Sequence, residues 1–520
     1  MRYFFPHFAF LLILLLCLNF SPAYSAEPEK KTDNLTGYTI RKILIVRNNV
    51  FDLSDPKESG WIGRAGNSFH ILTKEEVITF ELLFKEGDIY DMKLIEESER
   101  NLRKYPFLTE VHIKPVPDHE NKTIDVLVHT RDQWSLIVGG TFGLTTESAE
   151  VGLDVGEHNL FGTGQKVKYS MRSMDEGFSH SIGFRDDTVY DSRYSLALGH
   201  TLLKYERRYT AKIEKPFYSI MTKNSHGISY SYQDYSSDIL IYNNYRAQLF
   251  YAFSRPLARD DILRTYLILS LGEEIVDHPI TYTDRDNQLN LSFNFLLDPY
   301  SYEKETYIES FHQEEDVKLG TGIILSIGRR LEELGSSSSD TTGGLTIKKN
   351  FKMRKRDYLF TELVLRNHDT FFFKQYYVGR MKYYWRDFEN HSVVLHVMLA
   401  YQENIVKRFS LGGLKWLRGF KKDFFVGKNM LVINLEERIF TYKHLFYGTI
   451  EPGFVLFTDL GEAWRNVPGD KFDRLHQSVG AGLRFAVLKS PGVNLVRFDY
   501  GIPVDGSSKP YITIGVEGTF

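Results

Sequence analysis

An alternation of apolar with polar or small residues recurs from about Trp134 to the end of this chain, and it constrains the fold more than any other feature. Residues 194–199 and 393–399 show it clearly, because every second position is apolar. This period of two is typical of β-strands with one apolar face. No stretch of this region approaches the roughly 20 apolar residues of a membrane-spanning helix. The region is therefore either a soluble β-protein or a protein that crosses a membrane with strands.

The pieces between the strands favour a membrane barrel over a soluble sandwich. A sandwich usually has a turn every 8 to 12 residues or so, whereas long polar pieces such as residues 335–344 separate the strands here. Aromatic residues gather near strand ends, as in residues 371–385, where the girdles of an outer-membrane barrel require them. Residues 133–520 are therefore predicted to form an all-β transmembrane barrel. At roughly 24 residues per strand and connection, this length predicts about 16 antiparallel strands.

The last segment of the chain fits the same interpretation. Ile512, Ile514, Val516 and Phe520 share one face of a predicted strand that ends with the chain. An aromatic residue at the end of a lipid-facing strand resembles the terminal signal that bacterial barrel-assembly machinery recognises. We therefore interpret Phe520 as the terminal-strand signal of an outer-membrane protein.

The amino terminus indicates export. Residues 8–20 form an apolar run, and the small residues Ala23 and Ser25 occupy the positions that a signal peptidase reads. Residues 1–25 are therefore predicted to be a signal peptide and residues 26–37 a linker. Cys17 is the only cysteine, so the mature chain would have no disulfide, which fits a bacterial envelope protein. The near balance of 64 basic and 67 acidic residues argues against a nucleic-acid partner.

Residues 38–132 differ in kind from the barrel and predict one small α+β domain. A first helix is predicted to begin at Thr73, where Glu76 would complete a capping box. A second helix is predicted to begin near Asp91 and to end before Pro106. Strands are predicted at residues 39–47, 110–114 and 123–129. The predicted order is therefore strand, helix, helix, strand, strand.

Several segments, taken in their order along the chain, resemble a family of bacterial outer-membrane proteins. Residues 82–113 ("LLFKEGDIYDMKLIEESERNLRKYPFLTEVHI") resemble a POTRA domain, the periplasmic module that precedes barrels of the BamA/TamA superfamily. Residues 156–169 ("GEHNLFGTGQKVKY") resemble the segment after the first barrel strand, and "LRGF" at residues 417–420 matches a motif on a loop that folds into the lumen. "VINLEERI", "FTDLGEAW" and "SVGAGLRF" resemble strands that follow. The chain has room for a single POTRA domain, against several in the assembly proteins themselves.

The resemblance implies a structural role for the "LRGF" motif. Arg418, Gly419 and Phe420 would lie on the loop inside the lumen, and Arg418 would pair with the acidic residues Asp459 and Glu436 on the inner wall. A guanidinium group can bind a carboxylate through two hydrogen bonds, and an unpaired charge in a partly desolvated lumen is costly. The alternative interpretation of Arg418 is a solvated side chain in an extracellular loop.

No sequence pattern predicts catalysis, a cofactor or a metal site. The 16 histidines are scattered, residues 162–166 ("GTGQK") lack the spacing of a phosphate-binding P-loop, and neither Gly-x-Ser-x-Gly nor His-Glu-x-x-His occurs. Two classes of function fit the resemblance. In the first, the barrel sits in outer-membrane lipid and assists the insertion or translocation of polypeptides, while the POTRA domain binds clients or a periplasmic partner protein. Within this class, insertion of outer-membrane proteins, two-partner secretion and lipid export stay open. The second class is a passive pore or structural barrel.

Overall fold

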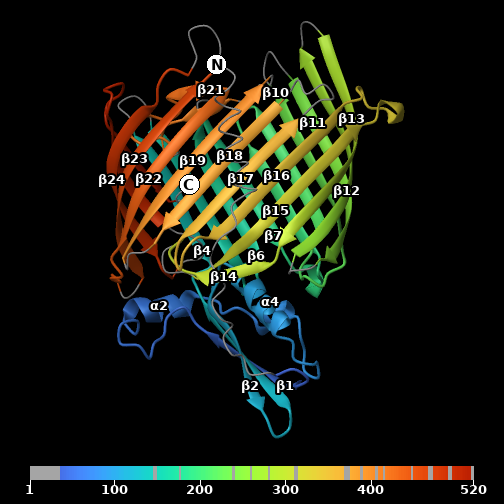
Figure 1. The fold of residues 1–520 in the computed structure, drawn as a ribbon, viewed down its shortest axis with the longest axis vertical. Coiled ribbons are helices and arrows are strands. Elements are labelled where there is room, and N and C mark those ends of the chain that lie inside the picture. The colour runs from blue at the N-terminus through green and yellow to red at the C-terminus, as the bar shows by residue number, and fades with distance from the viewer. Residues whose placement is uncertain are drawn as a thin grey trace.

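The computed structural model describes residues 35–144, 149–174, 177–236, 241–257, 261–278, 282–309, 314–367, 375–386, 390–403, 408–413, 416–446, 449–465, 472–489 and 495–516. Figure 1 shows a small N-terminal domain beneath one end of a large barrel. We call the rim of the barrel next to this domain the near rim and the opposite one the far rim. The predicted signal peptide and Phe520 lie outside the described residues.

The N-terminal domain contains a three-stranded sheet and, in the part of the chain that is described, three helices. β3 lies in the centre of the sheet, parallel to β1 and antiparallel to β2. Every second residue of β3 from Ile124 is buried, because alternate side chains of a central strand face the helices. The elements are β1 (Thr39–Asn48), α2 (Trp61–Phe69), α3 (Glu75–Glu81), α4 (Met92–Arg103), β2 (Leu108–Asp118) and β3 (Thr123–Asp132).

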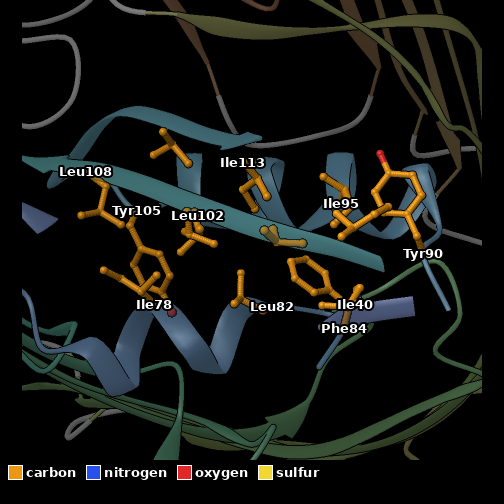
Figure 2. Packing of buried hydrophobic residues seen from close by; sticks show 14 of the residues in the cluster. Ile40, Ile78, Leu82, Phe84, Tyr90, Ile95, Leu102, Tyr105, Leu108 and Ile113 are labelled. Carbon is orange, nitrogen blue, oxygen red and sulfur yellow. The ribbon is translucent and has the colours of Figure 1, made fainter. Parts of the chain in front are cut away.

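The core of this domain lies between the sheet and the helices α3 and α4. Figure 2 shows Ile78, Ile95 and Leu102 from the helices gathered with Ile40 and Ile113 from the sheet. Each of these side chains is at most 6% exposed. Burial of one such side chain contributes about 1.5–3 kcal/mol, so the domain has an apolar core of its own.

Two features of this domain differ from the prediction. Helix α2 was missed, because the residues it buries are Gly63 and Gly66 and no apolar stripe marks its inner face. The capping box at Thr73 is wrong, since α3 begins at Glu75 and both the N–H and the hydroxyl of Thr73 donate to Asp132, at 2.7 and 2.8 Å. This buried carboxylate binds the side chain that would otherwise cap the helix.

The barrel is closed, and each strand is antiparallel to its neighbours. Two short 3₁₀ helices, Val189–Asp191 and Glu332–Leu334, lie in its connections. Its strands are β4 (Leu136–Leu144), β5 (Ala149–Leu160), β6 (Gln165–Met174), β7 (Gly177–Asp186), β8 (Ser195–Leu202), β9 (Glu206–Lys215), β10 (Asn224–Ser236), β11 (Ile241–Pro256), β12 (Asp261–His278), β13 (Tyr282–Pro299), β14 (Ser301–Glu305), β15 (Glu315–Arg330), β16 (Thr341–Lys352), β17 (Tyr358–Asn367), β18 (Gln375–Trp385), β19 (His391–Glu403), β22 (Asn429–Phe440), β23 (Ile450–Trp464), β24 (His476–Val487), β25 (Leu495–Pro503) and β26 (Tyr511–Val516).

The predicted number of about 16 strands is wrong. β13 and β14 both pair with β15 and form one interrupted strand, so the described ring contains twenty strands. Residues 136–516 then provide about 19 residues per strand and connection, fewer than assumed. Several connections are tight, and residues 203–205 alone separate β8 from β9. The alternation marks the strands, but the connection lengths decide how many of them there are.

The first and last strands close the barrel in a seam. The described part of their ladder runs from Ile512 opposite Leu144 to Gly515 opposite Thr141.

The wall has an apolar outside and a polar inside, as Leu435 is 41% exposed while the adjacent Glu436 is 1% exposed. No helix among the described residues combines the length and the apolar character needed to cross a membrane.

Candidate functional site

The connection between β19 and β22 folds back from the far rim into the lumen. Two short strands within it, β20 (Phe409–Leu411) and β21 (Phe425–Gly427), pair to form a hairpin. Leu411, Leu417 and Phe420 are fully buried and pack against inner-wall residues of β17, β18, β19, β22 and β23. We call the described residues 408–413 and 416–427 the inward loop.

Arg418 of the inward loop binds two carboxylates on the inner wall. Its Nε and Nη2 atoms donate to the two carboxylate oxygens of Asp459, at 2.8 Å each, and its backbone N–H donates to Asp459 at 3.0 Å. Its Nη1 atom donates to Oε1 of Glu436 at 2.5 Å. All three side chains are at most 1% exposed. The structure thus brings together the three charged residues that the sequence singled out, with Arg418 buried rather than solvated.

Two neighbours of this ion-pair cluster were missed in the sequence. The guanidinium of Arg418 lies 3.7 Å from the ring centroid of Phe457, a cation–π geometry. The amide of Asn434 donates to Asp459 at 2.8 Å and to the backbone oxygen of Trp416 at 2.6 Å. Both could have been found from the period of two, because Asn434 and Phe457 share strand faces with the acidic residues. Asp459 therefore accepts hydrogen bonds from both Arg418 and Asn434.

Gly419 sits where the inward loop comes closest to the barrel wall. Its φ of +88° is in the left-handed region, and a Cβ at this position would lie 3.0 Å from the backbone of Gly501 and 3.1 Å from Ser478. Any other residue would therefore carry both backbone strain and a steric conflict.

Replacing Gly419 with alanine is expected to lower barrel stability by about 1–3 kcal/mol, because strain and crowding act together. Gly506→Ala is the matched control, since Gly506 has a φ of +69° but open space around it. The temperature at which the folded, fast-migrating form disappears on a gel measures both variants. Equal losses in the two would contradict a close approach of loop and wall at Gly419.

A second segment enters the lumen from the near rim. The sequence analysis missed it, because its polar residues resemble those of a solvated connection. We call residues 301–309, which include β14, the near-rim segment. Ile308 is 2% exposed and packs with Tyr358 and Tyr384 of the inner wall. Arg438 joins the two inward elements, because its Nε donates to Glu436 at 3.0 Å and its Nη1 donates to the backbone oxygen of Ile308 at 3.1 Å. A continuous chain of polar contacts therefore runs from Arg418 to the near rim.

Helix α4 fixes the N-terminal domain to the near rim. Arg103 binds both carboxylate oxygens of Asp316 in β15, at 3.0 and 2.7 Å. Glu99 forms an ion pair with Lys304 of the near-rim segment. Side chains at these contacts are largely buried, apart from Lys304. The same helix thus contacts the barrel wall and the segment that enters its lumen.

The N-terminal domain also binds the barrel on both sides of the seam. Glu58 pairs at 2.7 Å with Lys489, which follows β24. On the other side, Asn159 of β5 donates to the hydroxyl of Thr73 at 2.8 Å. Because β24 and β25 precede the seam and β5 follows it in the ring, the domain spans the seam.

A cleft of about 1020 Å³ separates the N-terminal domain from the near rim. Lys104, Tyr105 and Glu110 line it from the domain, and Tyr442 and Lys489 line it from the barrel. Burial lowers the pKa of the Lys104 ammonium. The cleft is polar and carries both signs of charge. In the described part of the chain, no group of three or more His, Cys, Asp or Glu residues could hold a metal ion.

Comparison with known proteins places this architecture in a family. The Omp85 superfamily domain matches residues 159–513, more than half of the chain, and the surface antigen variable number repeat, a POTRA module, matches residues 66–131. The outer membrane protein assembly factor BamA of Neorickettsia risticii (strain Illinois) is 28% identical over 125 residues, which cover 23% of this chain and only 16% of that relative.

Solved structures with a similar fold include BamA from Haemophilus ducreyi lacking POTRA domains 1–3. It has a TM-score of 0.40 and 12% identity, over 92% of this chain and 84% of that one. CdiB from Escherichia coli has a TM-score of 0.45 and 13% identity, over 98% of both chains. On the strength of the matched domains, this chain belongs to the Omp85 superfamily and is an outer-membrane β-barrel with a POTRA domain.

Proposed function

We propose that this chain assists the insertion or translocation of polypeptides at the bacterial outer membrane, with its POTRA domain in the periplasm as the docking site for a client or partner protein. The observation that carries the proposal is the position of this domain across the seam, bonded through Glu58 to one side and through Thr73 to the other. A client held there would lie next to the place where the barrel wall can part without breaking the chain. The exposed apolar outer face, for example Leu435 and Leu456, would contact membrane lipid.

The composition of the seam strands supports lateral opening. β4 contains Gly139, Gly140 and Gly143, and β26 contains Gly515. Glycine weakens a strand, because it has no side chain to pack and loses more backbone entropy on ordering. The ladder between β4 and β26 would therefore part more readily than one built from branched residues.

The lumen itself favours a role in polypeptide insertion or translocation over a passive pore. A passive pore needs an open path for water, whereas the inward loop and the near-rim segment both enter the lumen and are held by buried groups such as Arg418 and Arg438. Secretion through the lumen would require both segments to move. Parting of the seam requires neither the inward loop nor the near-rim segment to leave the lumen.

The test is reconstitution of the full chain in lipid vesicles, followed by addition of a small outer-membrane barrel diluted from urea. We expect the client to fold about tenfold faster than in empty vesicles, as lowering the barrier by about 1.4 kcal/mol would do. Cysteines at Thr513 and Gly143, which are register partners across the seam, provide the control. Oxidation should remove the acceleration and a reductant should restore it. Steady ion conductance without any acceleration would instead support the passive pore.

A further inference from the structure

Large apolar side chains are exposed where the N-terminal domain meets the near rim. Trp61 begins α2, Phe69 ends it and Ile71 follows it, and these side chains are 69%, 82% and 54% exposed. Phe161, in the turn between β5 and β6, is 67% exposed. We call these four residues the rim patch. Single exposed apolar residues are common on proteins, whereas a group of them marks a binding surface.

The members of the rim patch point outward on neighbouring segments. His70 has an extended backbone, with φ of −84° and ψ of 135°, and its side chain is buried. Because alternate side chains of an extended segment point to opposite sides, Phe69 and Ile71 both face away from the domain. A Cβ at Gly162 would lie 3.4 Å from Cγ2 of Ile71. Ile71 therefore lies beside the turn that exposes Phe161, and the patch runs from the domain onto the barrel.

Helix α2 presents one face to the protein and the opposite face to its surroundings. A Cβ at Gly66 would lie 3.1 Å from the ring of Trp134, so the inner face of α2 packs just before the start of β4. Trp61, Arg64 and Ser68 are all exposed and follow one another at spacings of three and four residues, which places them on the outer face. Figure 1 shows α2 beneath the near rim, with its axis across that of the barrel.

The rim patch continues the apolar outside of the barrel. Leu136 and Val138, at the near-rim end of β4, are exposed on its outer face. Phe161 has a φ of +54°, a conformation that bulky residues rarely adopt. On the other side of the seam, the connection after β22 exposes Phe446 at a φ of +48°. The near rim thus exposes aromatic rings at strained turn positions on both sides of the seam.

We propose that the rim patch docks on the surface of the membrane, in the lipid leaflet next to the near rim, with its aromatic rings among the headgroups and Arg64 close to lipid phosphates. Aromatic and basic residues on one helix face are typical of helices that lie in a membrane interface. The barrel holds the patch at the rim, so even a weak affinity for lipid suffices. The inference goes beyond the proposed function, because it holds whether or not the chain moves a client.

The test uses residues 26–520, which contain no cysteine, in vesicles of phosphatidylethanolamine and phosphatidylglycerol. A fluorescent NBD label is attached at Ser68→Cys on the outer face of α2. The control label is at Ile89→Cys, because Ile89 is 68% exposed but bridges to Thr39, at the end of β1 far from the barrel. Lipids with a nitroxide near the headgroup should quench the label at Ser68→Cys at least fivefold more than the control. Equal quenching at the two positions would overturn the inference.

Replacing the aromatic rings provides the second measurement. The double substitution of Trp61→Ser and Phe69→Ser, made in the Ser68→Cys chain, should reduce quenching by nitroxide lipids at least threefold. Ile89→Ser removes an equally exposed apolar residue and should leave quenching unchanged. Unchanged quenching in the double variant would overturn the inference. Protection of the label from aqueous iodide without quenching by lipid would overturn it as well, because another part of the chain or a second copy would then cover the patch.

Discussion

Replacing Arg418 with alanine is expected to destabilise the barrel by up to about 3–5 kcal/mol, because two carboxylates would be left in a site with almost no access to water. Asp459 is 0% exposed and Glu436 is 1% exposed. Arg418→Lys keeps the charge but not the planar fork that binds both oxygens of Asp459, so it should recover only part of the loss. Thermal loss of the folded form on a gel measures each variant.

The two acidic residues are expected to couple unequally to Arg418. Asp459 accepts three hydrogen bonds from Arg418, whereas Glu436 accepts one and also binds Arg438 at 3.0 Å. A double-mutant cycle should therefore show larger non-additivity for Arg418→Ala with Asp459→Ala than with Glu436→Ala. Additive losses for both pairs, or ready cleavage of the inward loop by protease on intact cells, would contradict a buried cluster.

The resemblance to the BamA/TamA superfamily predicted this cluster, because "LRGF" and the two strands with acidic residues are short segments that can be recognised one by one. The resemblance implied that Arg418 pairs with Asp459 and Glu436. It could not predict the contact with Ile308, which depends on a segment far away in the sequence. Residues 301–309 contain three glutamate or lysine residues among their first five, so their hydropathy indicates a solvated connection. Only the arrangement of Tyr358, Tyr384 and Arg438 around them explains why they enter the lumen.

The fold, like the ion-pair cluster, was predicted in part. A period of two identifies strands and an outer face, and the barrel followed from it. The number of strands depends on connection lengths, which polar composition does not determine. In the N-terminal domain, Asp91 begins α4 as expected because its carboxylate accepts from the N–H of Lys93 at 2.9 Å. Thr73 was misinterpreted because its partner, Asp132, lies 59 residues away. The start of a helix was therefore predicted correctly at Asp91, whose partner is two residues away, and wrongly at Thr73, whose partner is distant in the sequence.

Deletion of residues 39–131 is expected to abolish the acceleration of client folding while the barrel still migrates as a folded, heat-modifiable species. The barrel's strands pair among themselves, and the ladder from β4 to β26 closes without the domain. The deletion removes Glu58, Glu99 and Arg103, so the near rim loses its ion pairs with the domain. These contacts position the domain across the seam, and their loss should affect delivery of a client more than assembly of the barrel.

Val126→Pro reproduces this loss with a single residue. Val126 is 0% exposed in the central strand β3, between Ile43 of β1 and Pro115 of β2. Because Pro115 faces away from β3, the N–H of its partner Val126 points to β1, and proline would remove a bond of the β1–β3 ladder. Val126→Ala keeps this N–H and is the matched control. Both deletion and proline should reduce client folding to the rate in empty vesicles. A barrel that fails to assemble would show that the domain serves folding of the chain itself, and unchanged acceleration would show that the client reaches the seam without it.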